Sequence, residues 1–167
     1  LLRAILDSPS DPSCVHMLGE ILVLEPPAGD QWLDARAFAV AATVASAEQD
    51  PAVCRTALAL YGGDYLPDDL YRDWASGLRE DLRRHYLALL QHLAILYEAE
   101  GDRAGAIQTL QQVLAADPAR EPAARSLMRL HAAAGQRTEA IRVFRRLAGV
   151  LASELAVQPE AETHALY

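Results

Sequence analysis

The sequence repeats itself at an interval of about 34 residues, so that position 94 aligns with position 128. Ala94-Ile95-Leu96-Tyr97 aligns with Met128-Arg129-Leu130-His131, and the residues that follow keep the same order of glycine, alanine and large apolar side chains. A unit of this length buries its apolar face only by stacking on a neighbour, so the pattern predicts a row of packed helix pairs. The further matches are Gly101 with Gly135, Ala106-Ile107 with Ala140-Ile141, Leu110 with Phe144, and Val113 with Leu147.

This spacing resembles the tetratricopeptide repeat, a helix-turn-helix unit of the same length. We assign the repeats to residues 86–118 and 120–152, although His131 and Ala152 stand in the second repeat where Tyr and Pro are usual. The alanines let two antiparallel helices approach closely, the first glycine ends a helix in a left-handed conformation, and the proline stops the next helix. The signature residues are Trp74, Ala94, Tyr97, Gly101, Ala106, Pro118, Gly135, Ala140 and Phe144.

More helices are predicted before the repeats. Apolar residues recur at helical spacing over residues 69–99, which predicts one amphipathic helix of about 45 Å at about 1.5 Å per residue. Residues 35–47 are also predicted to be helical, and Asp50 and Pro51 form a typical start for a helix that reaches Tyr61. Two repeats are seldom stable alone, so these helices should cover the open face of the first repeat. The predicted fold class is therefore all-α, with about seven helices.

The N-terminal part of the chain, positions 1–30, follows a different pattern. Residues 14–18 and 20–24, separated by Gly19, predict a short β-hairpin after a helical stub at residues 1–6. The proline- and glycine-rich residues 26–29 are typical of a linker. We therefore place a domain boundary near position 30.

Composition excludes several classes of function. The chain has 15 Arg, no Lys and 23 Asp and Glu, which gives a net charge of −8. Binding to phosphate backbones needs a basic face, so we expect no direct DNA binding by the chain. No apolar run approaches the roughly 20 residues of a membrane span, and no signal peptide is recognisable. The two cysteines, Cys14 and Cys54, are expected to be free thiols, so we predict a cytoplasmic protein. The first residue is not Met, which suggests that the sequence is a piece of a longer protein.

Charge is unevenly distributed along the chain. Six acidic residues against two arginines lie between positions 64 and 81, whereas seven arginines against two glutamates lie between 120 and 146. The two regions either attract each other within the fold, which we favour, or present a charged surface to a partner.

No pattern for catalysis or for a cofactor is recognisable. A nucleophile elbow, a phosphate-binding loop ending in Lys and a paired-cysteine motif are all missing from the sequence. His85 and His92 are seven residues apart on a helix, about 10 Å along its axis, which is too far to share a metal ion. Trp74 and Tyr97 could stack on bases, but at these spacings aromatic rings usually fill the seams between helices. We expect no enzyme activity, no metal and no cofactor.

Several spaced motifs together resemble one family. They are Tyr61-Gly62-Gly63-Asp64-Tyr65-Leu66, Trp74-Ala75, Leu78-Arg79, Asp117-Pro118, Leu127-Met128-Arg129-Leu130 and Glu154-Leu155-Ala156-Val157-Gln158-Pro159. From residue 33 to 167 the chain resembles the bacterial transcriptional activator domain of antibiotic-regulatory-type (SARP) regulators. The resemblance implies a winged-helix DNA-binding domain directly before this module. Residues 1–30 would then be the tail of that domain, with the predicted hairpin as its wing.

The first helices of the two repeats are the predicted partner-binding face. In tetratricopeptide repeats the fifth, ninth and twelfth positions of these helices usually line a concave groove. Arg125 and Arg129 share a helix face and could together bind a carboxylate, unless Glu98 or the acidic helix of the protein neutralises them. The candidate groove residues are Gln91, Ile95, Glu98, Arg125 and Arg129.

Two functions remain open at this point. The resemblance implies a non-catalytic module of a transcriptional regulator that packs against the winged helix, governs dimerisation or orientation, and contacts RNA polymerase. The alternative is a general helical-repeat scaffold that binds a peptide or partner within a multidomain signalling protein.

Overall fold

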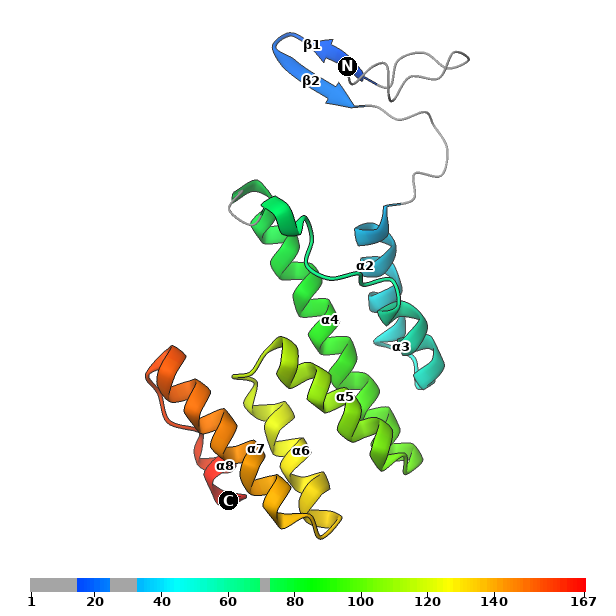
Figure 1. Cartoon of the computed structure of the whole chain (residues 1–167). Helices are drawn as coiled ribbons and strands as arrows, with labels where there is room; N and C mark the ends of the chain where they lie inside the picture. Colours follow the sequence, from blue (N-terminus) through cyan, green and yellow to red (C-terminus); the bar gives the residue numbers. More distant parts are fainter. Residues whose placement is uncertain (1–14, 25–32, 70–72) are drawn as a thin grey trace. The chain divides into compact units, whose positions relative to one another are not determined.

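The computed structural model describes residues 15–24, 33–69 and 73–167, and divides the chain into two units, Leu1–Leu33 and Asp34–Tyr167 (Figure 1). In the first unit, β1 (Val15–Leu18) and β2 (Ile21–Leu24) form an antiparallel hairpin in which Leu18 pairs with Ile21. Gly19 makes the turn with φ of +65°. The predicted hairpin is confirmed, whereas the predicted helical stub and linker lie outside the described residues.

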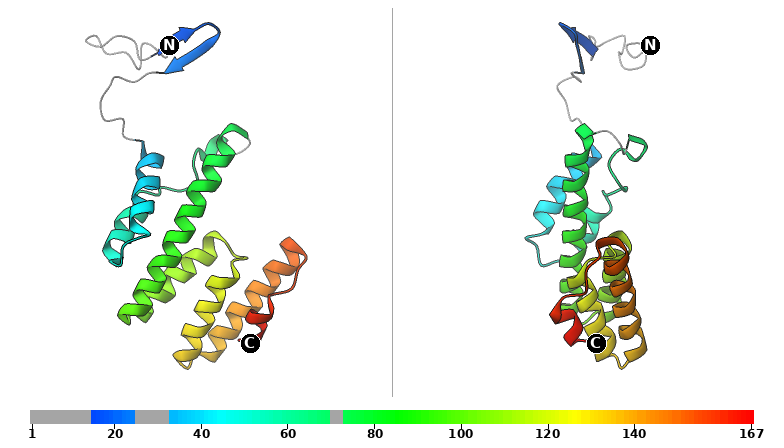
Figure 2. Two further views of the ribbon diagram at one scale, coloured as in Figure 1. Left: turned by 180° about the vertical axis from the view of Figure 1, so that it is seen from behind. Right: turned by 90° about the vertical axis from the view of Figure 1, so that its left-hand side faces the viewer.

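The second unit is built from α-helices, as the sequence predicts (Figures 1 and 2). Its described part contains seven α-helices, one 3-10 turn, η1, and one π-helical turn, η2. They are α2 (Asp34–Ala45), α3 (Pro51–Leu58), η1 (Pro67–Asp69), α4 (Asp73–Glu100), α5 (Arg103–Ala116), α6 (Glu121–Ala133), α7 (Arg137–Val150), η2 (Leu151–Leu155) and α8 (Ala161–Ala165).

The two repeats appear as the helix pairs α4–α5 and α6–α7. Gly101 and Gly135 end the first helix of each pair with φ of +79° and +73°, values that glycine adopts without steric cost. Asp102 then caps α5 by accepting a hydrogen bond of 2.9 Å from the backbone N–H of Gly105. The alanines of the signature, Ala94 and Ala106, are fully buried between the helices, as predicted.

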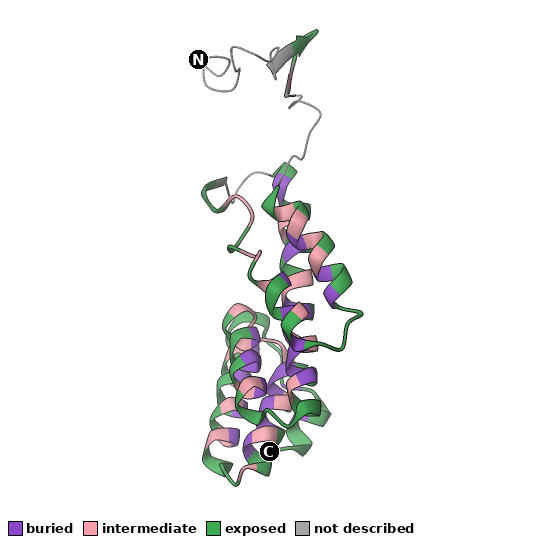
Figure 3. Ribbon diagram, turned by 90° about the vertical axis from the view of Figure 1, so that its right-hand side faces the viewer, coloured by how far each residue is buried: buried purple, intermediate pink, exposed green. Residues whose placement is uncertain are grey.

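Helix α4 joins the repeats to the helices before them. One side of it contributes Leu89 and Leu93 to a core shared with Phe38 of α2 and Cys54 of α3. Another side contributes Leu90 to a second core, which α5 and α6 complete. Figure 3 shows the buried residues (purple) alternating with exposed ones (green) along the helices. The expectation that upstream helices cover the first repeat is therefore confirmed.

Two details of the predicted long helix are wrong. Asp69 belongs to η1, and α4 begins at Asp73, with residues 70–72 outside the described part. Trp74 does not fill a helix seam, because 70% of its surface is exposed. Leu78, one turn further along, is 44% exposed. Helical periodicity identified this face of α4 correctly as apolar, but it did not indicate whether another element would cover it.

Candidate protein-interaction surface

Gln91 is used inside the fold. Its side-chain oxygen accepts two hydrogen bonds from the guanidinium of Arg120, of 3.1 Å from Nε and 2.9 Å from Nη2. Arg120 also lies 3.4 Å from the carboxylate of Asp117. Gln91 therefore ties α4 to the turn before α6, and its acceptor is already occupied.

Arg125 is also engaged within the chain. Its Nη1 donates to Glu160 Oε2 at 2.7 Å and to Thr163 Oγ1 at 3.1 Å, and its Nη2 lies 3.5 Å from Glu162 Oε2. One turn earlier on α6, Glu121 accepts hydrogen bonds from the backbone N–H of Glu160 at 2.9 Å and from the Thr163 hydroxyl at 2.6 Å. The partners of Arg125 are therefore in the C-terminal segment, residues 157–167, and neither Glu98 nor the acidic helix neutralises it.

The end of the C-terminal segment packs on α7. The ring of Tyr167 stacks on Phe144 with centroids 4.3 Å apart, and His164 meets the same ring edge-on at 5.3 Å. Thr163 is completely buried. Figure 1 shows α8 (red) beside α7. This arrangement covers part of the α6–α7 pair, which would otherwise be open on that side within the described residues.

The remaining three groove residues are exposed. Ile95 of α4 has 62% of its surface exposed, which is unusual for an isoleucine in an otherwise well-packed helix. Glu98 is exposed as well, and Arg129 of α6 is exposed with one hydrogen bond of 3.0 Å to Ser126. We call Ile95, Glu98 and Arg129 the exposed repeat face, since they come from the first helices of the two repeats.

The predicted attraction between the acidic and basic regions is not found. Among the described residues, ion pairs of the basic region join Arg120 to Asp117, Arg125 to the C-terminal segment, and Arg142 to Glu139. Each partner lies outside residues 64–81. Sequence composition alone could not distinguish such local pairs from pairing between distant regions.

The described titratable groups do not gather into a reactive cluster. No three of their His, Cys, Asp and Glu side chains lie close enough together to hold a metal ion. Burial raises the pKa of the Cys54 thiol, with a further contribution from Asp50, and burial also raises the pKa of the Tyr61 hydroxyl. His92 lies 2.8 Å from the backbone carbonyl of Glu48, near the end of α2, which is a structural contact.

Comparison with known protein families matches residues 33–167 to the bacterial transcriptional activator domain. The chain belongs to this family. The activator domain is a transcription-regulatory family that is not known as catalytic, and antibiotic-regulatory-type regulators carry it. No curated protein and no solved structure matches the chain. Among the described helices of the activator domain, none is long and apolar enough to cross a membrane.

Proposed function

We propose that residues 34–167 are a non-catalytic interaction module of a cytoplasmic bacterial DNA-binding regulator, and that the exposed repeat face contacts RNA polymerase. Membership of the activator domain family supports the setting in transcription. The observation that carries the contact is the exposure of Ile95, at 62%, together with that of Glu98 one turn along the same helix and of Arg129 on the first helix of the second repeat. An exposed large apolar side chain with a polar surround is typical of a protein interface.

In this proposal the module also packs against a winged-helix domain and sets its orientation or dimerisation. The exposed Trp74 and Leu78 at the start of α4 support a second protein contact, since both are large apolar side chains one helical turn apart. Aromatic side chains, tryptophan above all, contribute strongly to binding energy when a partner buries them. Direct DNA binding is left to the winged helix.

The test is capture of RNA polymerase holoenzyme by the full chain. The variant Ile95→Glu with Arg129→Glu removes the apolar contact and reverses one charge, and it should lose capture. Arg125 is not substituted, because it holds the C-terminal segment and its loss would disturb the fold.

A matched control carries Val40→Glu with Arg103→Glu. Val40 is 61% exposed on α2, and Arg103 is an exposed arginine at the first residue of α5, so this pair makes similar chemical changes elsewhere. The control should capture polymerase as the wild type does. Equal capture by both variants, or no capture by the wild type, would refute the polymerase contact.

A further inference from the structure

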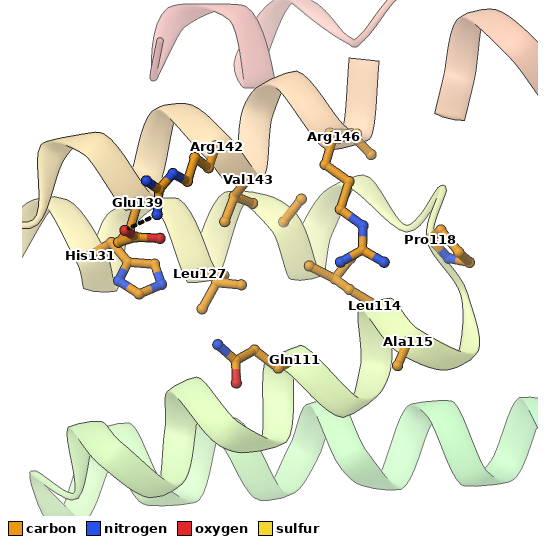
Figure 4. Close-up of a pocket in the computed structure, with 12 residues that line it drawn as sticks. Gln111, Leu114, Ala115, Pro118, Leu127, His131, Glu139, Arg142, Val143 and Arg146 are labelled. Carbon is orange, nitrogen blue, oxygen red and sulfur yellow. Dashed lines mark hydrogen bonds and ion pairs between the residues drawn. The ribbon is translucent and has the colours of Figure 1, made fainter. Parts of the chain in front are cut away.

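A pocket opens between α5, α6 and α7, and none of the residues of the exposed repeat face lines it (Figure 4). Its volume is about 330 Å³, at the lower end of the roughly 300–1,000 Å³ of small-molecule sites. The apolar part of its lining includes Leu114 of α5, Leu127 of α6 and Val143 of α7. Three helices therefore line a partly open, mainly apolar pocket whose volume suits a small ligand.

The charged residues of the pocket lie toward its two ends. Figure 4 shows Glu139, Arg142 and His131 at one end and Arg146 at the other. Glu139 and Arg146 are seven residues apart on α7, roughly 10 Å along the helix axis. Arg142 donates a hydrogen bond of 2.6 Å to Glu139, so these two charges compensate each other.

Arg146 has no hydrogen-bond or ion-pair partner among the described residues. Its guanidinium extends over the apolar lining beside Leu114 (Figure 4). The lining holds two arginines and one glutamate, which leaves one positive charge uncompensated. That charge matches a monoanion better than a phosphate monoester, which carries about −1.5 to −2 at pH 7.

His131 adds a polar group at the opposite end. Its Nδ1 lies 2.7 Å from Gln136 Oε1, and the residue is only 8% exposed. The other ring nitrogen of His131, Nε2, has no hydrogen-bond partner in the part of the chain that the structure describes. Every fully buried side-chain nitrogen and oxygen among the described residues does have such a partner, so Nε2 must be accessible to solvent. A ligand with its charged head at Arg146 would place its apolar body across Leu127 and keep its carboxylate away from that of Glu139.

We propose that this pocket binds a small monocarboxylate with an apolar body, and that the planar guanidinium of Arg146 pairs with its carboxylate. Arginine presents a fork of donors that fits a single carboxylate, and pairing in a partly apolar site is stronger than in water. Because α5 belongs to the first repeat and α6 and α7 to the second, a bound ligand would link the two repeats. The proposal is independent of the polymerase contact, which uses different residues.

Sodium octanoate is the probe, titrated into the full chain and followed by two-dimensional ¹H–¹⁵N NMR. Saturable shifts are expected at amides of α5, α6 and α7 around the pocket. Arg146→Met should weaken octanoate binding by about tenfold, the size expected when one charge-assisted pair is lost. Octylammonium has the same apolar body and the opposite charge, so it cannot pair with Arg146. Its affinity for the wild type should therefore be no higher than the affinity of octanoate for the Arg146→Met variant.

Arg145→Met is the matched control, since Arg145 is also exposed on α7 but does not line the pocket. It should leave the affinity unchanged. A second variant, Ala115→Trp, fills the pocket from α5 and should abolish the shifts. Absence of saturable binding, equal affinity of the Arg146 and Arg145 variants, or unimpaired binding by the Ala115 variant would each overturn the proposal.

Discussion

Gly101 and Gly149 have the same side chain and opposite structural roles. Gly101 ends α4 with φ of +79°, a conformation that residues with a side chain rarely adopt, although nothing lies within 4 Å of the position where a Cβ would be. Gly149 lies inside α7 and also has open space around it. Backbone conformation therefore decides which glycine is required, and crowding does not.

We predict that Gly101→Ala lowers the free energy of unfolding by about 1 kcal/mol, since alanine is strained in the left-handed region. Gly149→Ala should instead raise it by about 0.5–1 kcal/mol, because alanine favours a helix interior. Urea unfolding followed by circular dichroism measures both. Changes of the same sign in the two variants would contradict this explanation.

Cys54 is fully buried, and its Sγ donates a weak hydrogen bond of 3.6 Å to the Ala45 carbonyl. Burial raises the pKa of this thiol, so the folded chain keeps it protonated at a pH where the unfolded chain begins to ionise it. The stability that comes from this group is therefore fully present below the unfolded pKa of about 8.5 and declines as pH rises above it.

In a Cys14→Ser variant, Cys54 should react slowly with a thiol reagent at pH 8, because only the thiolate is a nucleophile and the side chain is covered. Adding urea through the unfolding transition should restore a normal rate. Fast reaction of the folded protein would show that Cys54 is accessible.

The exposure of Trp74 can be checked in a Trp32→Phe variant, in which Trp74 is the one remaining tryptophan. With 70% of its surface exposed, its fluorescence should be quenched strongly by acrylamide in the folded state. Unfolding should then add little to the quenching. Strong protection of the folded protein would mean that a partner surface, such as a second copy of the chain, covers this residue.

At the scale of elements, α6 holds the C-terminal segment through two residues one turn apart. Glu121 and Arg125 carry opposite charges on one face of α6. Arg125 donates hydrogen bonds to the side chains of Glu160 and Thr163, and Glu121 accepts hydrogen bonds from the backbone N–H of Glu160 and the hydroxyl of Thr163. Before this contact the chain passes through η2 and then Ala156, which has a left-handed φ of +54°. The segment is thus fixed in part by Arg125, a side chain that the sequence offered as a candidate for either partner binding or neutralisation within the chain.

Arg125→Met should lower the free energy of unfolding by about 1–2 kcal/mol, because it removes a charge-assisted contact and leaves the Thr163 site poorly satisfied. Hydrogen exchange in residues 157–167 should become faster. The loss of stability stays modest because the Glu160 side chain is 62% exposed, so solvent screens its ion pair with Arg125.

Arg142→Met is the matched control for this prediction. Arg142 pairs with Glu139 at 2.6 Å, but its side chain is 69% exposed, so the pair should contribute at most about 1 kcal/mol. Exchange in residues 157–167 should not change. If both variants released the segment equally, a general loss of positive charge would explain the result better than the specific contact.

At the scale of the whole molecule, the net charge of −8 governs long-range interactions with other molecules. Local ion pairs neutralise Arg120, Arg125 and Arg142, three of the seven arginines between positions 120 and 146, so less positive charge is left there to contact phosphates. A duplex attracts a protein chiefly through several basic residues that displace counterions together.

We therefore predict that the chain does not bind duplex DNA at physiological ionic strength. Fluorescence anisotropy of a labelled duplex, measured from about 50 to 200 mM salt, checks this over the range in which phosphate contacts change affinity steeply. Binding that weakens steadily with salt would show that the chain presents a basic surface despite its acidic balance.

The sequence alone determined the helical architecture and the positions where helices end. The repeat interval, the alanines at 94 and 106 and the glycines at 101 and 135 predicted two helix pairs, and the structure contains them. Such features are local, because helix periodicity, caps and left-handed glycines depend on residues close in the chain. Family membership followed from spaced motifs that the sequence also carries.

Only the tertiary structure decided which apolar and charged side chains are free. Trp74 was expected to fill a seam between helices and is exposed, whereas Arg125, for which partner binding and neutralisation within the chain were both open, is held by Glu160, 35 residues away along the chain. Periodicity shows which face of a helix is apolar or charged, but it carries no information about the element that covers that face. That depends on contacts between distant segments, which exist only once the chain has folded.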